Sequence, residues 1–183
     1  IIYQKGNEKV IPMPVLIQDF PTEILRKTHK FYQRSSTKAT HHLSMLGVIG
    51  LASVLANRIF ISDQDNMTPL YLCGIGISGR GKNNPKEVTC RILNESNLFA
   101  LIGSGTFTSS SALRNMLVKY PARIMIIDEF GDKLAEALNS RNCLMAGGFS
   151  ALKDLFSDCN GVYLKQAMAD TGQAPKNAEK DII

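Results

Sequence analysis

A glycine-rich turn between two very different segments constrains this chain more than any other feature. Residues 70–76, LYLCGIG, are almost continuously apolar, whereas residues 85–94 have the pattern of a helix. The run GISGRGKN at residues 76–83 fits GxxxxGK, with Asn where Ser or Thr usually follows. Glycines adopt backbone torsions that other residues resist, so successive N–H groups can point at one anion. The following helix adds its N-terminus, and the run therefore predicts a phosphate-binding loop.

Two positions of this loop have specific expected roles in binding a nucleotide and its metal ion. Lys82 adds a compact positive charge that can reach the β- and γ-phosphates of a nucleotide. Asn83 replaces the usual Mg²⁺-binding hydroxyl with a longer carboxamide, whose oxygen is still a suitable metal ligand. The alternative is a tight glycine turn that only joins a strand to a helix. The predicted nucleotide contacts are Gly76, Ser78, Gly79, Arg80, Gly81, Lys82 and Asn83.

The residues after the loop also resemble a helix start. In the run Asn84-Pro85-Lys86-Glu87, Asn84 is the expected N-cap, with Pro at the first helical position and Glu at the third. A helix that begins there starts later than a phosphate site prefers. Both interpretations can hold, because Pro in the first turn removes an N–H that has no partner within the helix.

An acidic pair follows a third apolar run farther along the chain. Residues 123–127, RIMII, lead directly into Asp128 and Glu129. Because ligands bind at the carboxyl ends of parallel strands, Asp128 is expected to hold Mg²⁺ and Glu129 to orient an attacking water. Lys82 is the other expected catalytic group. The alternative is a solvated acidic turn. A hydroxyl-rich stretch can line the γ-phosphate side or serve as loop and helix cap, and it comprises Thr106, Thr108, Ser109, Ser110 and Ser111.

The alternation of apolar runs and helical patterns predicts an α/β fold. Residues 70–76, 98–102 and 123–127 are expected to form parallel strands, with helices between them on the faces of the sheet. Helices are also expected near 42–58, 109–119, 132–140 and 149–158, and Thr108 or Ser109 is a possible N-cap of the helix at 109–119. We predict an N-terminal lead-in with helices at 1–60, a P-loop ATPase core at 61–165, and a mobile or truncated tail at 166–183.

Composition narrows the classes of partner and compartment. The chain has 183 residues and a formal net charge of +5, which permits a nucleic-acid partner without requiring one. Its four cysteines form no CxxC pair, so a zinc site is not expected. The longest apolar stretch, residues 43–56, is shorter than the roughly 20 residues that span a bilayer. No secretory leader opens the chain, and a cytoplasmic location in a bacterial or phage-infected cell is expected.

Taken in order, these segments resemble a known family. LSMLGVIGLASVLANR, PLYLCGIGISGRGK and GTFTSSSALRNMLVKYPARIMIIDEFG are similar to the RecA-like P-loop ATPase domain of phage and mobile-element primase/helicase-type replication proteins. The likeness covers about residues 20–170, including LKDLFSDCNGVYLKQAMAD after the acidic pair. It implies a three-layer fold with a parallel sheet, incomplete at its C-terminus because the later sensor and arginine-finger strands are not recognisable.

The resemblance also implies partners and an activity. These are ATP and Mg²⁺, a homo-oligomeric ring or filament, DNA bound weakly through charge, and ATP hydrolysis in DNA replication or unwinding. Arg141 is a candidate for reaching the nucleotide of a neighbouring subunit. The open alternatives are a nucleotide-binding structural or regulatory module without turnover, which Asn83 favours, and a DNA-packaging P-loop motor.

Overall fold

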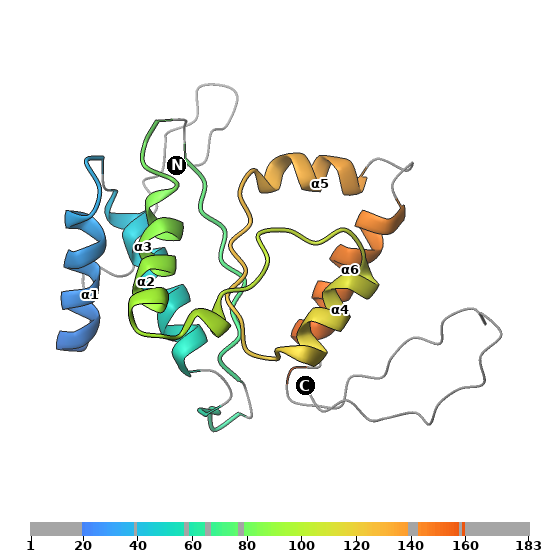
Figure 1. The fold of residues 1–183 in the computed structure, drawn as a ribbon, viewed down its shortest axis with the longest axis horizontal. Coiled ribbons are helices and arrows are strands. Elements are labelled where there is room, and N and C mark those ends of the chain that lie inside the picture. Colours follow the sequence, from blue (N-terminus) through green and yellow to red (C-terminus); the bar gives the residue numbers. More distant parts are fainter. Residues whose placement is uncertain are drawn as a thin grey trace, which may run out of the picture.

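The computed structural model is a helical structure with two groups of helices on either side of extended segments (Figure 1). It describes residues 20–38, 40–56, 59–64, 67–76, 79–138, 143–157 and 159. The first group contains α1 (Glu23–Arg34), α2 (His41–Ala56) and α3 (Asn84–Glu95). A short 3₁₀ helix, η1 (Phe99–Leu101), follows α3, and the second group contains α4 (Ser110–Lys119), α5 (Phe130–Leu138) and α6 (Cys143–Ser157).

The first group is built around α2, which packs against both α1 and α3. Its sequence is apolar and rich in small residues, so the neighbouring helices can approach closely. A Cβ added at Gly47 would lie 2.6 Å from the Tyr32 ring of α1 and 3.1 Å from Pro85 Cβ of α3. The buried side chains of this first cluster are Phe20, Tyr32, Met45, Val48, Leu51, Val54, Val88 and Leu93.

The second group has a smaller core centred on α6, which packs against α4 and α5. Helix α4 begins as expected from its sequence, because the Ser109 hydroxyl accepts a hydrogen bond from Ala112 N–H and caps the helix. The aromatic rings of Phe107 and Phe149 meet edge to face at 5.6 Å. The buried side chains of this second cluster are Phe107, Leu113, Met145 and Ala151.

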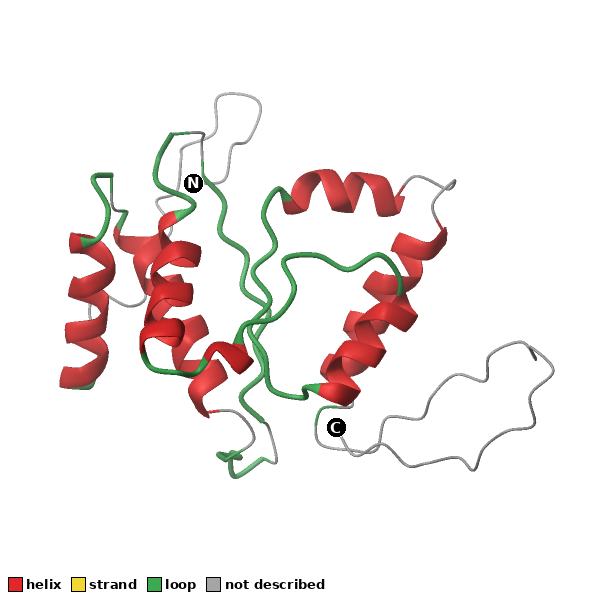
Figure 2. Cartoon of the chain, viewed as in Figure 1, coloured by secondary structure: helices red, strands yellow, loops and turns green. Residues whose placement is uncertain are grey.

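The predicted parallel sheet is wrong for the described part of the chain. Residues 70–76 and 123–127 are extended but form no strand, and η1 occupies most of the second expected strand at 98–102 (Figure 2). The described residues contain one isolated parallel bridge, between Ile102 and Ile124. Gly103 N–H donates to Ile124 O at 2.9 Å and Ile124 N–H donates to Leu101 O at 2.8 Å.

The failure of the sheet has a visible physical cause. A central strand must be covered on both faces, yet the side chain of Ile75 is 91% exposed and that of Tyr71 is 58% exposed. Instead of pairing in a sheet, the segment at residues 70–76 makes side-chain contacts with a helix. Tyr71 donates a hydrogen bond from its hydroxyl to Leu152 O of α6 at 2.5 Å, and its ring lies 5.2 Å from that of Phe156.

The helices expected from the sequence are confirmed. The segments predicted near 42–58, 85–94, 109–119, 132–140 and 149–158 correspond to α2 through α6, with bounds shifted by a few residues. In the part that the structure describes, none of these helices combines the length and apolar character needed to cross a bilayer. Residues 1–19 of the predicted lead-in, and the whole predicted tail at 166–183, lie outside the described residues.

Candidate phosphate-binding site

Two glycines of the predicted loop have backbone torsions that favour glycine. Gly79 has φ +75° and Gly81 has φ +76°, a region that side chains other than glycine rarely adopt. Both glycines lie within five residues of the start of α3. The two torsions turn the chain sharply so that the residues after Gly81 lead straight into the helix.

The N-terminus of α3 has free backbone donors. Asn84 N–H donates to Gly81 O at 3.2 Å, and Glu87 N–H donates to Asn83 O at 3.0 Å. The N–H groups of Lys82 and Asn83 have no acceptor among the described residues. Free N–H groups and the positive end of the helix dipole together favour an anion at this position.

The expected capping residue is corrected by one position. Asn83, rather than Asn84, is the N-cap of α3, and its side chain makes no capping hydrogen bond. The Asn84 side chain is buried and donates from Nδ2 to Tyr32 O at 3.0 Å, so it is committed to the core. The exposed Asn83 carboxamide therefore stays available to a ligand, and the helix begins closer to Lys82 than the capping pattern suggested.

The cationic side chains of the loop are accessible. Lys82 is exposed and forms no ion pair with any described residue. Its aliphatic stem lies over Gly76, where an added Cβ would be 3.4 Å from Lys82 Cγ. Arg80 is also exposed. Ser78, the remaining predicted contact, lies outside the described residues, as does Arg141.

A segment from another part of the chain touches this loop. An added Cβ at Gly81 would lie 2.6 Å from the carbonyl oxygen of Lys38 and 3.4 Å from Ser36 Oγ. Both residues belong to the connection between α1 and α2. Any side chain at position 81 would collide with backbone there, so Gly81 is required by packing as well as by its torsion.

The acidic pair lies at the start of α5, in the second group of helices. Asp128 and Glu129 are exposed, and Asp128 Oδ1 accepts the Glu129 N–H at 2.9 Å. Glu129 has φ +50°, a conformation uncommon outside glycine. No hydrogen bond or ion pair within the described residues joins either carboxylate to the loop at 79–83. The described residues also contain no group of three His, Cys, Asp or Glu side chains arranged to hold a metal ion.

The hydroxyl-rich stretch serves local structure where its contacts are visible. Ser109 caps α4, and Ser104 Oγ donates to Thr106 O at 2.6 Å. These contacts match the loop-and-cap interpretation.

The residues that pack against the loop and against the start of α3 were not predicted from the sequence. Tyr32 and Asn84 link α1 to the start of α3, and Lys38 contacts Gly81. The tyrosine hydroxyl lies 2.6 Å from Thr89 Oγ1, and burial raises the pKa of Tyr32 to about 12. The one signal in the sequence for such a contact was Asn84, a polar residue at the first position of the helix.

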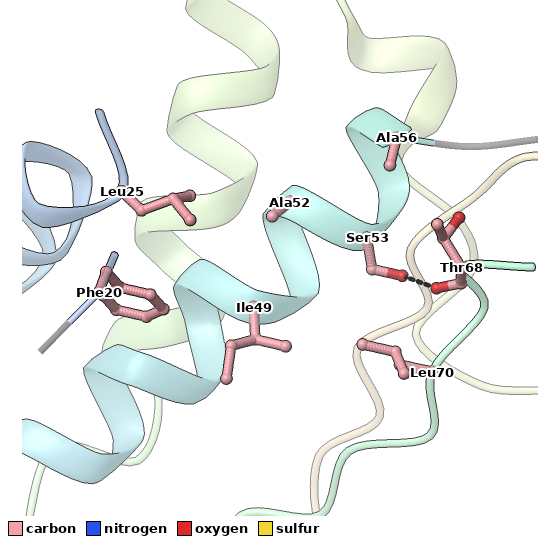
Figure 3. Close-up of a pocket in the computed structure, with 8 residues that line it drawn as sticks. All are labelled: Phe20, Leu25, Ile49, Ala52, Ser53, Ala56, Thr68 and Leu70. Carbon is pink, nitrogen blue, oxygen red and sulfur yellow. Dashed lines mark hydrogen bonds between the residues drawn. The ribbon is translucent and has the colours of Figure 1, made fainter. Parts of the chain in front are cut away.

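An apolar hollow lies away from the loop, between α1, α2 and residues 67–70 (Figure 3). Its volume is about 390 Å³. The one lining hydroxyl in α2, on Ser53, donates to Thr68 O and is therefore already used. The hollow offers no charged group, and it is lined by Phe20, Leu25, Ile49, Ala52, Ser53, Ala56, Thr68 and Leu70.

The chain was compared with known proteins by sequence and by structure. No protein-family model, curated protein or solved structure matches this chain.

Proposed function

We propose that this chain binds the phosphate groups of a nucleoside triphosphate, with ATP the first ligand to test. The observation that carries the proposal is the loop at 79–83. Two glycines with positive φ lead into a helix, and the N–H groups of Lys82 and Asn83 directly before it have no acceptor among the described residues, beside the exposed Lys82 side chain. Backbone donors, helix dipole and a mobile ammonium act on one small region, which suits a compact and highly charged anion.

Mg²⁺ is the proposed metal partner of the bound nucleotide. In nucleotide sites this ion is usually held by one or two side-chain oxygens together with phosphate oxygens. Asn83 and Asp128 both have exposed oxygens suited to it, and Glu129 is the proposed group for orienting water. Hydrolysis is expected to be slow, because Lys82 is the one assigned cation and an arginine finger contributes about 10³–10⁵ in rate.

The biological setting that we propose is DNA replication, in a helicase- or primase-type protein of a phage or mobile element. This part rests on the sequence resemblance at residues 20–170. Weak, salt-sensitive binding of DNA is expected from the net charge of +5. A nucleotide-binding module without turnover is the second candidate, favoured by Asp128 Oδ1 already accepting a backbone N–H.

The first test is substitution of the loop lysine. Lys82→Ala should weaken ATP binding by about 10- to 100-fold, because hydrogen bonds to charged groups contribute about 1.5–3 kcal/mol. The fold should persist, since the side chain is exposed. Isothermal titration calorimetry measures the affinity and circular dichroism the helix content. Lys153→Ala, at an exposed position of α6, is the matched control, and equal affinities of the two variants would refute the site.

The second test concerns the metal. Mg²⁺ should strengthen ATP binding to the wild-type chain, and Asp128→Asn should abolish most of this gain while leaving metal-free binding unchanged. Asp63→Asn removes another exposed carboxylate and should retain the gain. Titrations with and without Mg²⁺, combined with phosphate-release measurements, give both quantities. Asp128 has no metal role if the Mg²⁺ effect is the same in all three proteins.

A further inference from the structure

We propose that the connection between α1 and α2 forms a second wall of the phosphate site, and that Lys38 supplies a second cation for a polyphosphate chain. The inference rests on the proposed function and adds to it a binding residue from outside the glycine-rich loop. It also narrows the ligand to a nucleoside di- or triphosphate rather than a monophosphate.

Direct contact places this connection at the loop. The closest approach is between the Gly81 backbone and the Lys38 carbonyl oxygen, 2.6 Å from an added Cβ. Ser36 Oγ accepts the Lys38 N–H at 3.2 Å and lies 3.4 Å from the same Cβ position. Lys38 is therefore held at the turn that Gly81 makes just before Lys82.

The connection is also anchored to α3, the helix that receives the phosphate. Arg91 donates from Nη2 to Ser35 Oγ at 2.8 Å, and its guanidinium lies 5.0 Å from the centroid of the Phe31 ring. One turn earlier on α1, Tyr32 O accepts the Asn84 side chain. These contacts fix the end of α1 against the first residue of α3 and against Arg91 in its second half, so residues 35–38 have a defined place beside the loop.

Lys38 follows a segment of the chain that contains a single carboxylate. Between residues 20 and 38 the sequence has one carboxylate, Glu23, and it lies at the start of α1 in an ion pair with Lys27 at 2.8 Å. Lys38 is exposed and forms no ion pair with any described residue. An ammonium on a flexible four-carbon stem can move to an anion bound at the adjacent turn.

Two cations on two separate elements suit an extended chain of phosphates. Lys82 follows Gly81 in sequence, and Lys38 lies against Gly81 from the connection between the helices. A monophosphate can bind one of these two lysines, whereas a di- or triphosphate has enough negatively charged groups to bind both. Removal of Lys38 should therefore reduce binding of ATP and ADP more than binding of AMP.

The experiment compares Lys38→Ala, Lys38→Arg and Lys30→Ala in the full chain. Lys30 is an exposed lysine of α1 whose side chain has no hydrogen bond or ion pair with any described residue, so it matches the loss of one charge. Calorimetry gives the dissociation constants for ATP, ADP and AMP, and inorganic tripolyphosphate is used as competitor. We expect Lys38→Ala to weaken ATP binding about tenfold and AMP binding less than twofold, with unchanged thermal unfolding. Lys38→Arg should restore most of the affinity.

The outcomes separate this inference from the proposed function. If ATP binds the wild-type chain and Lys82→Ala removes that binding, but Lys38→Ala matches Lys30→Ala, the second wall is wrong and the loop assignment stands. If Lys38→Ala weakens the binding of ATP and of AMP equally, Lys38 does not distinguish a polyphosphate from a monophosphate, and this part of the inference is wrong. If the wild-type chain binds neither ATP nor tripolyphosphate, both proposals are overturned.

Discussion

Tyr32 is the residue that connects the three helices around the proposed site. Its side chain is fully buried, its hydroxyl contacts Thr89 Oγ1 of α3, and it donates to Gly47 O of α2 at 3.4 Å. Its own carbonyl accepts the Asn84 side chain. The ring fits because Gly47 has no side chain. One tyrosine thus links α1, α2 and the first turn of α3 by hydrogen bonds and packing.

The buried hydroxyl of Tyr32 predicts a loss of stability at high pH. Burial raises its pKa to about 12 from an ordinary value of 10.0, so the neutral form is favoured in the folded state. The stabilisation is complete below pH 10 and falls as pH rises from 10 to about 12, where the unfolded tyrosine ionises first. Two pKa units correspond to about 2–3 kcal/mol.

Tyr32→Phe tests this coupling. At pH 8 the variant should be less stable by about 1–2 kcal/mol, because Thr89 loses its partner. Between pH 10 and 12 it should lose less additional stability than the wild-type chain. Urea unfolding followed by circular dichroism at several pH values gives both quantities. Tyr120→Phe makes the same chemical change at an exposed position and should leave the wild-type profile unaltered.

The torsions of two loop glycines were predictable from the sequence, whereas the surroundings of the loop were not. Gly79 and Gly81 have the positive φ that the motif requires, and the requirement is local to the sequence. The contacts of Lys38 with Gly81 and of Tyr32 with Asn84 join residues separated by more than 40 positions. No pattern of spacing in a single sequence indicates such pairs, so the second wall emerged only from the structure.

At the level of elements, helices were predictable and strands were not. A helix satisfies its hydrogen bonds within itself, and signals such as Ser109 at the start of α4 are read locally. A strand needs a partner elsewhere in the chain, so an apolar run alone does not establish one. Residues 123–127 show the difference. Ile124 packs on the first cluster while Met125 and Ile127 pack on the second, yet the segment forms a single bridge.

At the scale of the whole molecule, the described residues form two hydrophobic clusters, and the proposed phosphate site lies beside one of them. The first cluster lies beneath α3 and includes Leu93, while the second joins α4 to α6 and includes Leu113. The extended segments between the helix groups touch both (Figure 1). The loop at 79–83 contacts residues 36–38 and Gly76, which lie on the side of the first cluster.

Truncation of one core leucine in each cluster should therefore have different effects on binding. Leu93 and Leu113 are both almost fully buried, and Leu→Ala in a core costs about 2–5 kcal/mol. Leu93→Ala should weaken ATP binding along with stability, because it loosens α3. Leu113→Ala should reduce stability while leaving ATP affinity within about twofold. Parallel calorimetry and thermal unfolding make the comparison, and equal losses of affinity would mean that the clusters act as one unit.

The position of the first cluster along the chain has a consequence for synthesis. Apart from Ile124, its members all come before residue 103, whereas the acidic pair stands at 128 and 129. A growing polypeptide emerges from its N-terminal side, and early segments can fold before later ones appear. Under the proposed function, the nascent chain should then be able to hold a phosphate before Asp128 and Glu129 have emerged.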